Sequence, residues 1–126
     1  MSRASDQRGA VAVELALILP ILVILIFGIV MFGLFFNRQV SLTGAARDGA
    51  RVMAITNDVA AARTATINAA PGLGLTAANV TVAGACPAGA TTSVTVTATR
   101  TDTYQIPLVG EWDLEASGTG VMRCGG

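Results

Sequence analysis

Side chains that commonly perform catalysis are scarce in this sequence of 126 residues. It has no histidine, and all eight of its basic side chains are arginines, so it offers neither an imidazole base nor a lysine nucleophile. Neither cysteine has an obvious activating neighbour, and no glycine-rich loop for phosphate is present. We therefore expect no enzymatic activity and no cofactor.

The two cysteines, Cys86 and Cys124, are better suited to a structural bond. Their spacing fits neither a thioredoxin-like pair nor a zinc site, both of which need closer or additional ligands. In an oxidising compartment a disulfide between them would close a long loop and contribute roughly 4 kcal/mol in the loop-entropy view. A small domain with a thin core benefits from such a bond. We expect the disulfide, which would place the C-terminal region outside the cytoplasm.

A segment near the C-terminus carries Glu111, Asp113 and Glu115 on one face of a predicted strand, with Asp102 expected nearby. Carboxylates gathered in this way are candidate calcium ligands. No glycine-punctuated ligand loop accompanies them, however, and acidic residues on the solvent side of a strand are common. We therefore interpret them as solvated and expect no metal site.

Glu14 is the only ionisable side chain in an otherwise apolar segment that runs from Ala10 to Phe36. At about 1.5 Å per residue, the uncharged residues 15–36 give roughly 33 Å of helix, which matches a bilayer core of about 30 Å. The alternative is a buried helix of a soluble protein, but so small a domain could hardly cover such a helix on every face. We therefore predict a transmembrane helix over residues 10–36.

The helical pattern continues beyond this segment, over residues 37–72. One face carries small or apolar residues at helical spacing: Leu42, Ala46, Gly49 and Met53. Arg47 and Arg51 lie elsewhere on the circumference, where they are either solvated or contact Asp48, lipid headgroups or an acidic partner. Residues 56–58 are able to cap a second helix over 59–70, which Pro71 and Gly72 end.

Residues 73–126 show the period of a β-sheet. Alternation over 79–83, 91–101 and 112–116 predicts three strands, with Val94, Val96 and Ala98 on one face of the second. Turns are expected at 87–89 and 107–110. We predict a small antiparallel sheet whose apolar face lies on the preceding helix, and thus an α+β fold.

A short polar leader, residues 1–9, precedes the apolar segment and ends in Arg8 and Gly9. A secretory signal has an apolar stretch of about 7 to 15 residues followed by a small-x-small cleavage site. Here the stretch is about twice as long and no such site follows Phe36. The apolar segment is therefore expected to stay in the mature protein.

The leader and the start of the helix resemble the prepilin signal of type IV pilins and pseudopilins, in which a membrane peptidase cuts after a glycine and the fifth mature residue is glutamate. Gly9 and Glu14 stand at these positions, so the resemblance implies a mature chain that begins at Ala10, where the best-known pilins have phenylalanine. The motif RGAVAVELALILP, the apolar run and the stretch LTGAARDGARVMA together resemble the TadE-like family of minor pseudopilins from tight-adherence pilus systems. The resemblance extends to residue 55, and beyond it only the pilin-like layout is shared.

The resemblance implies roles for the membrane segment and a set of partners. In a pilin-like assembly the new amino group of Ala10 is neutralised by Glu14 of an adjoining subunit, which sets the axial register. Alternatively, Glu14 lies at the membrane surface and reaches the headgroups. Pro20 is expected to kink the helix, the alternative being local melting in a filament. The implied partners are membrane lipid, a prepilin peptidase, other pilin or pseudopilin subunits and the pilus assembly machinery.

Eight acidic side chains balance eight arginines, so the formal net charge is zero and no nucleic acid partner is expected. Arginines flank the apolar segment on both sides, so the expected disulfide is the better guide to an extracytoplasmic C-terminal region, in the periplasm or at the cell surface. We infer a pseudopilin-like structural or assembly component of a tight-adherence pilus, processed by a prepilin peptidase and acting by helix–helix association. The alternative is an uncleaved single-span protein whose sheet binds an extracytoplasmic ligand. Whether the subunit is major, minor or an initiator stays open.

Overall fold

The computed structural model describes residues 3–106 and 109–125, with the backbone alone described for residues 3–6. The chain forms two compact units, which meet in the sequence between Phe35 and Phe36. The first unit contains the N-terminal part of one long helix. The second contains the rest of that helix, a second helix and a three-stranded sheet. The predicted α+β fold is confirmed.

Helix α1 extends from Arg3 to Thr56 without interruption, so part of the polar leader is helical as well. Its first half is rich in Leu, Ile, Val and Phe, and these side chains are exposed around the whole helix. A helix that is apolar on every side needs an apolar environment, because water solvates it poorly. By length and composition this stretch of α1 is a candidate membrane span.

The end of α1 follows local signals. Asn57 adopts a left-handed backbone with φ of 50°, and its amide donates to the Met53 carbonyl at 2.9 Å. Asp58 then caps helix α2, Val59–Ala69, by accepting from the amides of Ala60 and Ala61 at 2.8 and 3.2 Å. A short 3-10 helix, η1 (Pro71–Leu73), follows α2, and a second, η2 (Ala77–Asn79), leads into the sheet. The predicted cap, second helix and stop are confirmed.

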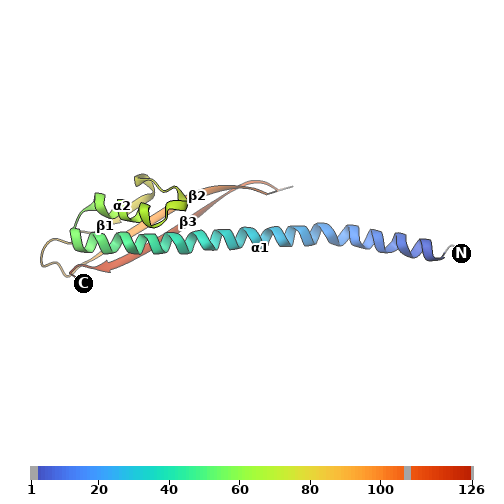
Figure 1. The fold of residues 1–126 in the computed structure, drawn as a ribbon, viewed down its shortest axis with the longest axis horizontal. Helices are drawn as coiled ribbons and strands as arrows, with labels where there is room; N and C mark the ends of the chain where they lie inside the picture. Colours follow the sequence, from blue (N-terminus) through green and yellow to red (C-terminus); the bar gives the residue numbers. More distant parts are fainter. Residues whose placement is uncertain (1–2, 107–108, 126) are drawn as a thin grey trace. The chain divides into compact units, whose positions relative to one another are not determined.

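The sheet consists of β1 (Val80–Ala83), β2 (Ser93–Ile106) and β3 (Gly110–Arg123), antiparallel and in that order. Figure 1 shows β2 and β3 as a long hairpin that continues well past α2 and β1. The predicted strands are present, but β2 and β3 are longer than predicted. At the predicted turn over 107–110, residues 107–108 lie outside the described part, and the Val109 amide donates to the Ile106 carbonyl at 3.1 Å.

The core of the second unit lies between α1 and the sheet. The predicted helix face is buried, as are Val94, Val96 and Ala98 of β2. On β3, a Cβ atom at Gly118 would collide with the backbone of Leu42 and Thr43, and one at Gly120 would come within 2.5 Å of the Ala46 backbone. The helix therefore rests directly on the strand backbone. This contact requires glycine in the extension of β3, which was not predicted.

A second close approach joins the two helices. Gly49 of α1 faces Ala62 and Thr66 of α2, and a Cβ atom at Gly49 would collide with the Thr66 hydroxyl. Thr66 is fully buried, and its hydroxyl donates to the Ala62 carbonyl at 2.9 Å. Arg63 extends from α2 to the sheet, where its Nε donates to the Val80 carbonyl at 3.2 Å. Small residues on α1 thus allow α2 to pack closely.

The structure joins Cys86 and Cys124 by the expected disulfide, with a Cα–Cα distance of 5.2 Å. Cys86 packs with Met53 and Val94 in the core. Its amide donates to the Oδ1 atom of Asn57 at 2.7 Å, so the bond also holds the corner between the helices. The bridge thus fastens the loop before β2 and the end of β3 to one core.

One part of the sheet departs from the prediction. Alternation placed Trp112, Leu114 and Ala116 on the apolar face covered by the helix. Ala116 is buried there, but Trp112 and Leu114 are exposed. The alternation is correct, because all three lie on the same face of β3 as Gly118. The hairpin continues past α2 and β1 (Figure 1). The side chains of Trp112 and Leu114, near its turn, are exposed.

Candidate functional site

The residues predicted for processing and assembly all lie in the first unit, on α1. Gly9, Ala10 and Glu14 are exposed, and the Gly9–Ala10 bond is part of the helix. No other group lies within 4 Å of a Cβ atom placed at Gly9, among the described residues. The helix continues through Pro20 without a break. This segment is a continuous apolar surface that carries one acid.

The predicted contact residues Arg47 and Arg51 lie on α1 in the second unit, one turn apart. Both are exposed and point away from the face that packs on the sheet. Within residues 7–106 and 109–125, neither forms an ion pair, and Asp48 beside them does not either. Two unpaired cations therefore stand on the outer side of the helix.

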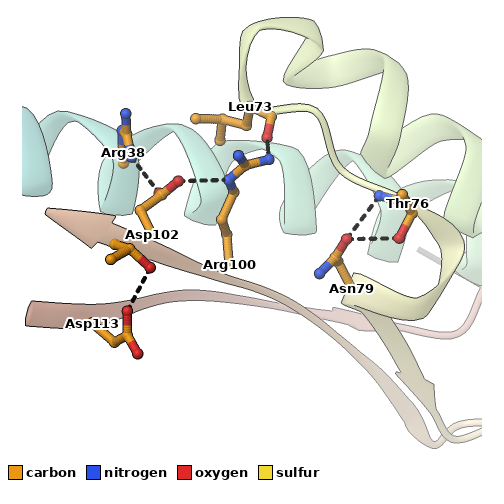
Figure 2. Close-up of polar contacts among 8 residues, drawn as sticks. Arg38, Leu73, Thr76, Asn79, Arg100, Asp102 and Asp113 are labelled. Carbon is orange, nitrogen blue, oxygen red and sulfur yellow. Dashed lines mark hydrogen bonds and ion pairs between the residues drawn. The ribbon is translucent and has the colours of Figure 1, made fainter. Parts of the chain in front are cut away.

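A charged cluster that was not predicted lies where the chain enters the second unit. Arg38 of α1 forms an ion pair with Asp102 of β2, and the Arg100 Nε donates to the same carboxylate at 3.0 Å (Figure 2). Arg100 also donates to the carbonyl of Leu73, which ends η1. The Cζ atom of Arg38 lies 5.5 Å from the centre of the Tyr104 ring, a cation–π distance. These contacts connect the helix, the hairpin and the loop after α2.

Two arginines around one carboxylate change its protonation. Burial acts to raise the pKa of Asp102, but the hydrogen bonds from Arg100 and Arg38 and their positive charges lower it by more. The net effect is a pKa below the ordinary value, so Asp102 stays ionised near neutral pH. The side chain of Asp102 is 16% exposed, which leaves the pair better shielded from solvent than an ordinary surface ion pair.

The cluster corrects the expectation that Asp102 lies near the acidic residues of β3. Asp102 pairs across the strands with Leu114 and faces the helix, whereas Glu111, Asp113 and Glu115 face the opposite way. On that outer face the Thr103 hydroxyl donates to Asp113 at 2.5 Å (Figure 2), and the Gln105 amide donates to a Glu111 oxygen at 2.9 Å. In the described part of the chain, no three acidic, cysteine or histidine side chains come together as a metal site.

An apolar helix exposed on all sides, followed by a small disulfide-bonded α+β unit, is the layout of a single-span membrane protein. Residues 9–51 match the family model described as TadE-like protein, which confirms the resemblance over the segment that carries Gly9, Glu14 and Pro20. The match shows that this segment is similar to TadE-like proteins. It ends within α1, so the sheet lies outside it. No curated protein and no solved structure matches the chain.

Proposed function

We propose that this chain is a pseudopilin-like component of a tight-adherence pilus, cut after Gly9 by a prepilin peptidase and acting by association. The observation that carries the proposal is the exposed apolar part of α1, which begins at the start of the family match. Such a surface has no partner within the described chain, so lipid or neighbouring helices must cover it. Its function is therefore binding and assembly, without turnover.

Glu14 supplies the specific contact in this proposal. Cleavage creates a cationic amino group at Ala10, about one helical turn from Glu14. A carboxylate inside a membrane segment is costly, and it is stabilised by a nearby cation more strongly than it would be in water. An amine from one subunit and Glu14 from the next would fix how far neighbouring helices are displaced along their axes.

The second unit is proposed to lie outside the cytoplasm. The disulfide between Cys86 and Cys124 supports this, because such bonds persist in oxidising compartments. With this orientation, Arg47 and Arg51 are available to acidic groups of a neighbouring subunit. The outer face of β3, with Glu111, Asp113 and Glu115, is exposed and of opposite charge.

The experiment is to co-express the chain with the prepilin peptidase of its own pilus system and to determine the intact mass and the N-terminal residue. We expect a product that begins at Ala10. Gly9→Val should remain uncut, because a β-branched side chain then occupies the position before the scissile bond. Gly28→Val is the matched control, since no group lies within 4 Å of its Cβ position in the described structure. It should be processed like the wild type.

Assembly is tested separately with Glu14→Gln, which keeps the shape and removes the charge. This variant should be processed normally but should fail to co-purify with neighbouring subunits. A leader that stays intact beside an active peptidase would instead favour the uncleaved membrane-anchored binding module.

A further inference from the structure

Apolar side chains are exposed at the end of the β2–β3 hairpin where its turn lies. We define the hairpin tip as residues 104–106 and 109–114. Val109 is 71% exposed, Trp112 61% and Leu114 38%, while Tyr104 and Ile106 are half-buried. Tyr104 and Trp112 pair across the strands, so the two aromatic rings lie on one face. A small soluble domain rarely leaves such a group of side chains in water.

Contacts within the second unit show which way the tip points. Gly120 lies against Ala46 and Gly118 against Leu42, and Asp102 pairs with Arg38. The path from Gly120 to Gly118 along β3 thus leads toward the N-terminal end of α1 within this unit. From the Asp102–Leu114 pair to the Ile106–Gly110 pair, the hairpin extends by roughly 13 Å more in that direction. The tip therefore lies at the end of the unit where the chain enters, beside Arg38.

That end of the unit is the one closest to the candidate membrane span along the chain. The apolar segment ends at Phe36, and Arg38 is the first charged residue after it. A lipid headgroup region must therefore lie near Arg38 if the apolar segment is inserted. Tryptophan and tyrosine favour this region, because their rings are amphipathic.

The charges of the hairpin fit a surface with one side in lipid and one in water. Asp102 faces the helix but is paired with two arginines, so it adds no bare charge to the apolar face. The remaining acidic residues of the hairpin, Glu111, Asp113 and Glu115, point to the opposite face by strand alternation. They can stay hydrated while Trp112 is in contact with lipid.

We propose that the hairpin tip is a second membrane contact, in which Trp112, Val109 and Leu114 insert into the headgroup region of the bilayer. The contact rests on the membrane span of the proposed function, and it does not depend on cleavage after Gly9. It would hold the second unit against the membrane before assembly, with the helix and the hairpin as two points of attachment.

The chain contains a single tryptophan, so its fluorescence reports on the tip alone. The full-length protein is reconstituted in phosphatidylcholine vesicles, with and without lipid brominated near the headgroup, and floated on a density gradient. We expect floated protein to lose about half of its Trp112 emission with brominated lipid, as an interfacial tryptophan does, and to be little affected by acrylamide in water.

The matched control moves the reporter along the same strand. In Trp112→Phe/Val121→Trp the tryptophan stands near the other end of β3, where the natural valine is 58% exposed. Its emission should be quenched by acrylamide and unaffected by brominated lipid. This control separates contact at the tip from general closeness of the vesicle.

The remaining outcomes overturn the proposal in distinguishable ways. If the protein floats but its Trp112 emission is quenched by acrylamide and unaffected by brominated lipid, the membrane span is supported and the tip contact is rejected. Protection from both quenchers means that the tip is covered by another copy of the chain, which also rejects the lipid contact. Protein that fails to float rejects the span itself, and the tip contact with it.

Discussion

The two units of the chain use the same helix in different ways. In the first unit, α1 has exposed apolar side chains on all sides and no covering element among the described residues. In the second unit, α1 buries one face against glycines of β3 and against α2. The first unit must therefore obtain its stability from its surroundings, whereas the second carries its own core and disulfide. The difference indicates that a substitution that destabilises the second unit should have little effect in the first.

The largest effect is expected where the helix rests on the strand. Gly118→Val places a side chain into the backbone of α1 and should cost about 3 kcal/mol, a large fraction of the stability of a small domain. Urea-dependent cleavage by trypsin, in detergent-solubilised protein, measures this. Gly28→Val, the same change in the first unit, should leave the urea midpoint unchanged, since none of the described neighbours lies within 4 Å of its Cβ position. Equal midpoints for both variants would remove the contrast between the units.

The disulfide should have the next largest effect, again only in the second unit. Replacing both Cys86 and Cys124 by serine should lower the free energy of unfolding by about 2–4 kcal/mol, because the unfolded chain regains the freedom of a long loop. The same proteolysis assay measures the change. Reduction of the wild type should reproduce it, and flotation with vesicles should persist in both cases. If reduction instead abolished flotation, the membrane span would depend on the disulfide, and the effect would not be confined to the second unit.

A smaller effect is expected at the helix corner. Asp58→Ala removes the cap that accepts from two amides of α2 and should cost about 1 kcal/mol. Asp58→Asn retains an oxygen acceptor and should recover most of the loss. The readout is the urea midpoint of the second unit. A loss as large in the Asn variant as in the Ala variant would show that the charge, and not the cap, matters.

The smallest effect is the pH dependence of the Asp102 cluster. Because the pKa of Asp102 is lowered on folding, its pairs contribute stability above the unfolded value near 3.8 and lose it as the pH falls through the folded pKa. The stability difference between wild type and Asp102→Asn should thus be largest at neutral pH, below about 1 kcal/mol, and shrink under acid conditions. Arg38→Gln should reduce that shrinkage. If the stability difference between wild type and Asp102→Asn grew on acidification, the pKa of Asp102 would be raised on folding and not lowered.

Local patterns predicted much of the fold. The apolar run predicted the exposed helix, residues 56–58 predicted the corner, and alternation predicted which side chains of β2 are buried. Each of these depends on residues that are close in sequence, so periodicity and capping chemistry are sufficient.

Features that depend on distant residues were not predicted. The third strand was predicted over residues 112–116 only. The close approach of α1 explains why it continues through the glycines at 118 and 120. The Arg38–Asp102–Arg100 cluster could be predicted only by knowing which residues of α1 lie opposite which residues of the hairpin. Alternation assigned Trp112 to the correct face but carried no information on how far the helix and α2 cover it. The roles of Gly9, Ala10, Glu14 and Pro20 stay predictions, because they concern partners.

The contact of Gly118 and Gly120 with α1 has a mechanical consequence. Two residues of β3 span about 6.6 Å and four residues of α1 about 6 Å, so the strand and the helix run side by side in the same direction. A force that pulls on α1 along its axis would load this contact in shear, across many atoms at once, rather than peel it open. The disulfide also holds the C-terminal end of the same strand. We therefore expect the second unit to stay folded when force is applied along α1.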